Sequence, residues 1–412
     1  MSSYFPRIAD HLVEDALKSF GAVVLEGPRA AGKTTTGHKF SNSSVSLDSA
    51  PELAALAESA PELVLAGEIP RLIDEWQLAP TIWNSIRHEV DVRKAPGQYI
   101  ITGSATPTDT VTHHSGAGRF ARITLSTMSL AESGESTKQV SLARVLAGAK
   151  VAGLGGPTVA DYASIVVRGG WPSLVVNRSR SPLPYLRSYL SDISRIDIPA
   201  LGMAEPDPLR MRALVRATSR NLATEANYSL LAREAEISPS TVRKYLDALS
   251  KVFVLDELPA WAPHLRSRVR IRTSPKLHFV DPSLAAASIG ANPTALLDDL
   301  NTFGFFFESL AIRDLRVYAA ASEGTVQHFR DETGLEVDAI VEDYSGNWSA
   351  FEIKMGGSAA IDQAAANLKA LANKVSKSRA STMASLNVVT AGKASFTRPD
   401  GVNVISLGHL TQ

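Results

Sequence analysis

The chain has 412 residues, 44% of them hydrophobic and 20% charged, which is a composition typical of globular domains. Its 42 basic side chains balance its 42 acidic ones, so a strongly basic coat for nucleic acid is excluded, while local basic patches are not. Because the sequence contains no cysteine, disulfides, thiolate zinc sites and a cysteine nucleophile are excluded as well. A chain of this length is expected to form about two or three domains.

The first residues do not have the pattern of a signal peptide. Met1–Asp15 contains Asp10, Glu14 and Asp15 and lacks a central apolar stretch. No uninterrupted apolar run in the chain approaches the ~20 residues that a membrane helix requires. We therefore expect a cytoplasmic protein that does not span a membrane.

Helical and strand-like patterns alternate over residues 1–135. Arg7–Phe20 has the apolar spacing of an amphipathic helix. Short apolar runs then predict five strands, at Val23–Glu26, Val45–Leu47, Arg71–Ile73, Gln98–Thr102 and Ala121–Leu125. Because strands alternate with helices, the sequence predicts an α/β fold whose parallel sheet is covered by helices on both faces.

A glycine-rich loop follows the first predicted strand and fits the phosphate-binding pattern G-x-x-x-x-G-K-[ST] at every fixed position. Such a loop directs backbone N–H groups and a helix N-terminus at phosphate oxygens, which predicts a nucleoside triphosphate, ATP, together with Mg²⁺. Lys33 is expected to reach the β- and γ-phosphates, and the Thr34 hydroxyl to ligate Mg²⁺. The residues expected to hold the nucleotide are Gly27, Pro28, Arg29, Ala30, Ala31, Gly32, Lys33, Thr34 and Thr35.

Polar residues close the third and fourth predicted strands. Asp74 and Glu75 follow the third strand, the Walker B arrangement of additional-strand ATPases, in which Asp74 holds Mg²⁺ through water and Glu75 polarises the attacking water. The fourth strand runs into Thr102, Gly103 and Ser104. A hydroxyl here would lie between the phosphate loop and Asp74 as a sensor of the γ-phosphate. Thr102 and Ser104 are both eligible, and strand alternation does not choose between them.

Arg119 lies in a glycine-rich loop, 115–122, next to the nucleotide strand. An arginine in this position is a candidate arginine finger, which stabilises charge in the transition state of phosphoryl transfer. If it acts on a neighbouring subunit, the protein is a homo-oligomer. The alternative is an ordinary surface charge or the partner of a carboxylate.

Three stretches in this order are similar to a large group of prokaryotic AAA-type ATPases: 72–77 (LIDEWQ), 100–105 (IITGSA) and Gly118-Arg119. The resemblance implies a C-terminal domain of unknown function made of a winged helix and a nuclease-like fold. It divides the chain into an ATPase domain (1–135), a helical connector or lid (136–205), a winged helix (206–272) and a nuclease-like domain (273–412).

The connector is predicted to contain a glycine-rich loop at Gly148–Pro157 and a helix at Ser181–Asp197. Beyond it, a helix, a short helix, a turn and a helix that starts at a Ser240 cap predict a winged helix-turn-helix, closed by a strand at Val252–Leu258. The three helices are expected at Met211–Ser219, Leu230–Ala235 and Thr241–Ser250.

A winged helix of this kind can read DNA, or it can act as a lid or a protein-interaction module. In a DNA reader the side chains facing the major groove would be Ser238, Ser240, Thr241, Arg243 and Lys244. An alternating run also places Arg266, Arg268, Arg270 and Arg272 on one face of a strand. That ridge could contact phosphates, or it could be a solvated edge that resists strand pairing.

The last part of the chain fits the loose PD-(D/E)-x-K nuclease pattern, with Asp338 on one predicted strand and Glu352 and Lys354 on the next. Two carboxylates on adjoining strands can share Mg²⁺, while the lysine orients the attacking water. Glu308 on the preceding helix would complete the carboxylate set, and Gln363 on the following helix could assist at the phosphate. The resemblance supports the restriction-endonuclease-like α/β fold more than the activity, because such domains are often inactive and used for binding.

These observations together predict an ATP-binding and ATP-hydrolysing switch whose C-terminal half contacts nucleic acid, DNA rather than RNA. Two alternatives stay open: an ATP-regulated, metal-dependent nuclease in defence or repair, and a non-catalytic, ATP-controlled platform for protein interaction.

Overall fold

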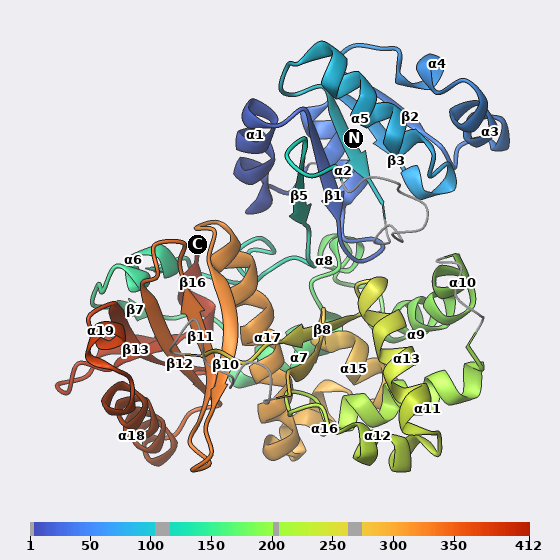
Figure 1. Ribbon diagram of the computed structural model, residues 1–412. Helices are drawn as coiled ribbons and strands as arrows, with labels where there is room; N and C mark the ends of the chain where they lie inside the picture. Colours follow the sequence, from blue (N-terminus) through green and yellow to red (C-terminus); the bar gives the residue numbers. More distant parts are fainter. Residues whose placement is uncertain (1–3, 104–115, 201–205, 263–273) are drawn as a thin grey trace. The chain divides into compact units, whose positions relative to one another are not determined.

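The computed structural model describes residues 4–103, 116–200, 206–262 and 274–412. The chain separates into two compact units (Figure 1). Unit 1 runs to Thr127 and includes short segments that begin at Arg195 and Lys251, and unit 2 contains the remainder. None of the helices within the described ranges is both long and apolar enough to cross a membrane.

Unit 1 is built on a five-stranded sheet in the order β2-β3-β4-β1-β5, and every pairing in it is parallel. The predicted parallel sheet is therefore confirmed. Because every pairing is parallel, the carboxyl ends of all five strands meet at one edge, where β4 lies between β1 and β3. The strands are β1 (Ala22–Glu26), β2 (Ser43–Ser46), β3 (Arg71–Asp74), β4 (Tyr99–Thr102) and β5 (Phe120–Thr124).

Helices cover both faces of this sheet. They are α1 (Ala9–Ser19), α2 (Lys33–Phe40), α3 (Pro51–Ser59), α4 (Pro61–Leu65), the 3₁₀ turn η1 (Trp76–Leu78) and α5 (Ile82–Arg93). Alternate residues of β1 explain why: Ala22 and Val24 pack against the α5 side, whereas Val23 and Leu25 pack against the α1 side. A strand buried on both faces needs a continuous apolar run, which is what β1 contains.

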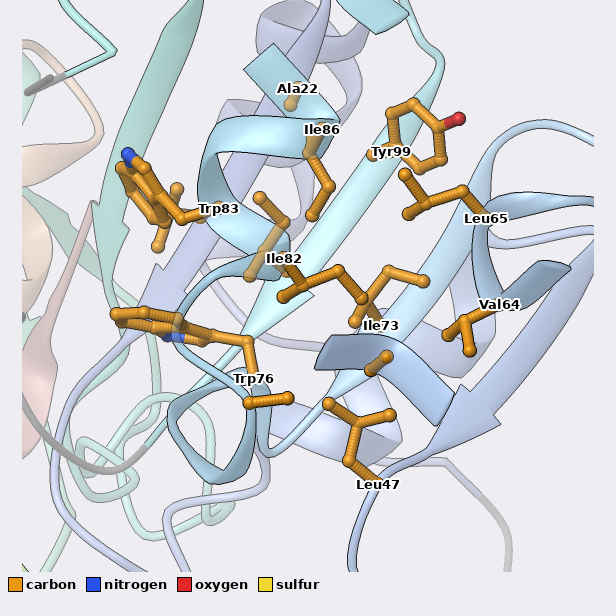
Figure 2. Close-up of a cluster of buried hydrophobic side chains, with 14 of the residues drawn as sticks. Ala22, Leu47, Val64, Leu65, Ile73, Trp76, Ile82, Trp83, Ile86 and Tyr99 are labelled. Carbon is orange, nitrogen blue, oxygen red and sulfur yellow. The ribbon is translucent and has the colours of Figure 1, made fainter. Parts of the chain in front are cut away.

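The larger of the two cores lies under α5 (Figure 2). Trp83 is fully buried there, and its ring meets Phe120 edge to face at 4.7 Å and Trp76 at 5.1 Å between centroids. Trp76 lies two residues after β3 and Phe120 opens β5, so these aromatic contacts connect two strands that are not neighbours, within one cluster.

Unit 2 contains a seven-stranded mixed sheet in the order β10-β11-β12-β13-β15-β14-β7. β12, β13 and β15 run parallel to one another, and the other pairings are antiparallel. Two smaller pairs are also present, β6 with β16 and β8 with β9. The strands are β6 (Val140–Ser141), β7 (Ala152–Leu154), β8 (Leu255–Leu258), β9 (Lys276–Phe279), β10 (Thr325–Arg330), β11 (Glu336–Glu342), β12 (Trp348–Lys354), β13 (Met383–Thr390), β14 (Ala394–Thr397), β15 (Asn403–Ser406) and β16 (Leu410–Thr411).

The described residues after Thr127 also form helices and helical turns. They are α6 (Leu142–Leu146), α7 (Val159–Arg168), α8 (Pro172–Val176), α9 (Pro182–Asp192), the π-helical turn η2 (Ile193–Asp197), α10 (Ile198–Ala200), α11 (Pro208–Arg220), α12 (Tyr228–Ala235), α13 (Pro239–Lys251), α15 (Pro282–Ile289), α16 (Pro293–Asp298), α17 (Leu300–Ala320), α18 (Ser358–Lys374), α19 (Lys377–Ala380) and the 3₁₀ turn η3 (Leu407–His409).

Two local features differ from the sequence predictions. Gly148–Pro157 is not entirely loop, because Ala152–Leu154 forms β7 and pairs with β14 at the edge of the large sheet. A three-residue strand with a central glycine has no periodic signal, so only its partner strand reveals it. The helix predicted to start at a Ser240 cap begins at Pro239 instead, and the Ser238 hydroxyl accepts the N–H of Thr241. Proline at the first helical position explains the earlier start.

The predicted helix, short helix, turn and helix are present as α11, α12 and α13, followed by the antiparallel pair β8–β9. The strand predicted at Val252–Leu258 is shorter, Leu255–Leu258. The arginine ridge at Arg266, Arg268, Arg270 and Arg272 lies outside the described residues.

Candidate nucleotide site and carboxylate–lysine cluster

The phosphate loop connects β1 to α2 and requires glycine at both ends. Gly27 has a φ of +138°, and a Cβ there would lie 2.2 Å from the carbonyl oxygen of Leu125. Gly32, which precedes α2, has a φ of +100°. Both values lie in the region that side-chain-bearing residues rarely adopt, so the backbone of this loop depends on glycine. The loop lies between a buried strand and a helix, which is the position that the phosphate-binding pattern requires.

Lys33 opens α2 and is buried over the loop. Its Nζ donates hydrogen bonds to the carbonyl oxygens of Gly27 at 2.9 Å and Pro28 at 2.8 Å. Burial lowers the pKa of Lys33 to about 8, although Glu75 and Asp74 favour its charged form. Main-chain oxygens thus hold the ammonium inside the loop. An anion bound beside it would stabilise its charged form.

Three hydroxyls converge on Asp74 at the end of β3, and two of them, those of Thr34 and Thr102, were predicted. The Thr34 hydroxyl donates to Asp74 Oδ1 at 2.9 Å, and the Thr102 hydroxyl at the end of β4 donates to the same oxygen. The Ser46 hydroxyl, at the end of β2, donates to Asp74 Oδ2 at 3.1 Å. Ser46 was not predicted as part of this site, because the strand was expected at Val45–Leu47, which puts this residue inside the strand rather than at its end.

Glu75 follows Asp74 in the left-handed conformation, with a φ of +55°. The side-chain amide of Gln77 donates to the Glu75 carboxylate. Burial raises the pKa of Glu75, while the hydrogen bond from Gln77 opposes that shift. A partly buried carboxylate with a raised pKa beside a phosphate loop has the properties of a proton acceptor.

The other predicted side chains of this site, where the structure describes them, form no hydrogen bond with Asp74 or Lys33. The Arg29 guanidinium is half exposed and forms an ion pair with Asp197 at 2.9 Å, and Thr35 is exposed on α2. Arg119 immediately precedes β5 and pairs with Asp91 at 2.8 Å. Because β5 is parallel to β1, Arg119 lies at the sheet edge opposite the phosphate loop of its own chain. Ser104 lies outside the described residues.

Arg7 supports the loop from the amino-terminal side and was not predicted. It is buried, and its guanidinium donates to the carbonyl oxygens of Ala31 and Ser126, both at 2.8 Å. It therefore ties the loop to the segment after β5. In the sequence it is only the first residue of an amphipathic pattern, and nothing in that pattern indicates a contact 24 residues away.

A second group of charged residues lies in unit 2 and brings together the predicted nuclease-type residues. Glu308 comes from α17, Asp338 from β11, and Glu352 and Lys354 from β12. Lys354 Nζ lies 3.1 Å from Asp338 Oδ2 and 2.7 Å from Glu352 Oε2. The order helix, strand and strand thus places these four side chains in one cluster, as the pattern predicted.

The cluster also contains Lys276 of β9, which the sequence analysis did not include. Its Nζ lies 2.9 Å from Glu308 Oε1, 2.6 Å from Glu336 Oε1 and 3.5 Å from Asp338 Oδ1. We call Lys276, Glu308, Glu336, Asp338, Glu352 and Lys354 the carboxylate–lysine cluster. Gln363 is exposed and one step removed from it: its amide donates to Asn367, and the Asn367 amide donates to Glu352.

Burial and the two lysines set the protonation of this cluster. Burial raises the pKa of Glu308 to about 8 and that of Glu352 to about 7. Burial also opposes ionisation of Asp338, but Lys276 and Lys354 outweigh it and lower the Asp338 pKa. In turn Glu308, Asp338 and Glu336 overcome the effect of burial on Lys276 and raise its pKa. Lys276 is therefore a charged ammonium at neutral pH.

Within the ranges that the structure describes, no three acidic or histidine side chains are arranged to hold a metal ion. The predicted set of Glu308, Asp338 and Glu352 is present, but its oxygens face lysine nitrogens. Lys276 could not be found from the motif, because it lies 62 residues before Asp338 in the chain.

Comparisons with known proteins agree with the interpretation of the glycine-rich loop as a phosphate-binding loop. Residues 19–134, which include the loop, Asp74 and Glu75, match a family model described as an AAA domain. Two models described as domains of unknown function, DUF8612 and DUF4143, match residues 159–295 and 303–410. The AAA match supports ATP binding by the first part of the chain.

Two proteins described as uncharacterized, from Mycobacterium bovis and Mycobacterium tuberculosis, are each 28% identical to this chain over 356 residues, covering 84% of it and 73% of their own length. Among solved structures, a Walker-type ATPase of Pyrococcus abyssi is similar at a TM-score of 0.42 and 12% identity, over 69% of this chain and 96% of its own. A likeness at that level carries no functional information.

Proposed function

We propose that this chain is an ATP-hydrolysing molecular switch. The observation that carries the proposal is the convergence of Lys33, Thr34, Asp74, Glu75 and Thr102 at the carboxyl edge of one parallel sheet, around a loop with the phosphate-binding pattern. Open α/β sheets bind their ligands at this edge.

The residues present fit ATP and Mg²⁺. The loop has a buried ammonium and a helix N-terminus, both of which favour phosphate oxygens. The Thr34 hydroxyl and the Asp74 carboxylate already lie 2.9 Å apart, and hydroxyl and carboxylate oxygens are the ligands that Mg²⁺ prefers. Mg²⁺ bound there would neutralise charge on the phosphates. Lys33 would exchange its bonds to loop carbonyls for bonds to phosphate.

Glu75 would act as the general base. Its carboxylate is held by Gln77 beside Asp74, and its burial-raised pKa favours acceptance of a proton from water. Thr102 would sense the γ-phosphate through Asp74, because its hydroxyl donates to the carboxylate that Thr34 also contacts. Arg119, at the opposite edge of its own sheet, would act on a neighbouring subunit of a homo-oligomer.

We also propose that the α12–α13 region contacts nucleic acid through the start of α13. The hydroxyls of Ser238, Ser240 and Thr241 form one exposed group there. Arg243 and Lys244 follow and are exposed, and the Arg243 guanidinium lies over the Tyr228 ring. Hydroxyls and cations at the start of a second helix are the groups that helix-turn-helix proteins use on DNA.

The test of the switch is a comparison of wild type with Lys33→Met in two assays, binding of a fluorescent ATP analogue and release of phosphate. The proposal predicts nucleotide binding and phosphate release by wild type and neither by the variant. A wild-type protein that binds no nucleotide in the presence of Mg²⁺ would overturn the proposal. Binding without turnover would leave an ATP-controlled platform in its place.

A further inference from the structure

The geometry of the carboxylate–lysine cluster does not fit a shared divalent cation. The two oxygens that would share an ion, Glu308 Oε1 and Asp338 Oδ1, lie 2.9 and 3.5 Å from the Lys276 nitrogen. Mg²⁺ binds carboxylate oxygens at about 2.0–2.1 Å and keeps its own waters. An ion within that distance of both oxygens would occupy the space that the ammonium fills.

The other oxygen of Asp338 and both oxygens of Glu352 accept from nitrogen donors as well. Asp338 Oδ2 accepts from Lys354 at 3.1 Å and from the backbone N–H of Ile353 at 2.7 Å. Glu352 Oε2 lies 2.7 Å from Lys354, and its Oε1 accepts from Asn367. Each carboxylate thus directs at least one oxygen to a nitrogen donor, which does not fit a ligand set shared around one metal ion.

Lys276 is fixed in this place by the backbone around it. β9 pairs with β8, where Lys276 lies opposite Leu258, and a β-bridge on its other side joins it to Glu225. Its side chain is only 3% exposed. Its ammonium has three N–H donors and three carboxylates around it, from Glu308, Glu336 and Asp338, so its hydrogen-bonding capacity is filled.

We propose that Lys276 is the resident cation of this cluster and stands in the place of a divalent metal ion. The C-terminal module therefore holds its carboxylates together without metal and does not perform metal-dependent phosphodiester cleavage. This inference is independent of ATP hydrolysis in unit 1. It also gives a specific expectation: without the ammonium, a group of closely spaced carboxylates will attract a divalent cation.

Mn²⁺ binding to the full-length chain, measured by electron paramagnetic resonance without nucleotide, tests the proposal. All proteins carry Asp74→Asn, so that the phosphate-loop site does not contribute. We expect no Mn²⁺ bound at the cluster in this background, and about one Mn²⁺ per chain after Lys276→Met. Adding Asp338→Asn should remove that ion. Lys393→Met, which changes an exposed lysine, should bind no more Mn²⁺ than the Asp74→Asn protein alone.

Thermal unfolding gives a second readout. Lys276→Met leaves buried carboxylates without their cation, which should lower the melting temperature by on the order of 10 °C. Mn²⁺ should restore part of that loss in Lys276→Met and none of it in the background protein. If Lys276→Met does not fold, Lys276→Gln replaces it, because its amide keeps hydrogen-bond donors.

Two results would overturn the proposal. One is Mn²⁺ binding by the background protein that Asp338→Asn abolishes, since the cluster would then accept metal with Lys276 present. The other is a folded Lys276→Met or Lys276→Gln protein that gains no Mn²⁺, since the ammonium would then not be what occupies the place of the ion.

Discussion

Replacing Glu75 with glutamine isolates the proposed base from the rest of the nucleotide site. The substitution keeps the size of the side chain and removes its ability to accept a proton from water. In the structure the Glu75 carboxylate takes a hydrogen bond from Gln77, whereas Lys33 is bonded to the loop carbonyls and Thr34 to Asp74. The proposed chemical step and the proposed binding of nucleotide therefore rest on different contacts.

The expected loss follows from these roles. General-base catalysis contributes about 10²–10⁴-fold to a rate, so Glu75→Gln should lower ATP turnover by about that factor. At 1.36 kcal/mol per factor of ten, the barrier rises by about 2.7–5.4 kcal/mol. The nucleotide dissociation constant should change by less than about threefold, because an interaction confined to the transition state affects turnover alone.

Phosphate release under single-turnover conditions measures the rate, and titration of a fluorescent ATP analogue measures affinity. Glu52→Gln, an exposed glutamate at the start of α3, is the matched control and should leave both values unchanged. Turnover by Glu75→Gln within about threefold of wild type would refute the role of Glu75 as base.

Three further substitutions test other parts of the molecule. Arg313→Met leaves Asp281 and Asp314, both fully buried, without the guanidinium that lies 3.0 and 2.7 Å from them, and should lower the free energy of unfolding by about 3–5 kcal/mol in a denaturant titration. Arg119→Ala should lower ATP turnover by about 10³-fold or more, and mixing it with Lys33→Met protein should recover part of the activity if the finger acts between subunits. Arg243→Glu should weaken binding of a DNA duplex in fluorescence anisotropy and flatten its salt dependence.

For each of these three predictions, one result would contradict the reasoning behind it. Arg313→Lys keeps the charge and should lose less stability than Arg313→Met; equal losses would remove ionic pairing as the cause. Mixed subunits without recovered turnover would assign Arg119 to its ion pair with Asp91. Equal duplex affinity for Arg243→Glu and wild type would exclude the start of α13 as the contact.

The sequence indicated that Thr34, Asp74 and Thr102 lie close together because the signals that place them are local. The phosphate loop is one continuous motif, and Asp74 and Thr102 each end an apolar strand of a kind that parallel sheets require. Since the carboxyl ends of parallel strands share one edge, the order of these strands already brings their last residues together. The structure places Thr34 and Thr102 on the same Asp74 oxygen.

Long-range contacts were not available from the sequence. Arg7 supports the loop through Ala31 and Ser126, and Ser46 joins Asp74 from β2, but neither residue belongs to a motif. Arg119 appears in a suggestive glycine-rich loop, yet the parallel pairing of β5 with β1 places it at the edge away from the phosphate loop of its chain. Which edge a loop occupies depends on strand direction, which a local pattern does not contain.

The C-terminal module shows most clearly what the sequence can predict and what only the tertiary structure reveals. From the order of helix and strands, the sequence by itself predicted that Glu308, Asp338, Glu352 and Lys354 lie close together, and the structure brings them into one cluster. Only the tertiary structure decided what lies among them. β9, far from that motif in the chain, inserts the Lys276 ammonium between the carboxylates. Since a charge acts through space, the cation that neutralises a buried site need not come from the motif that defines it.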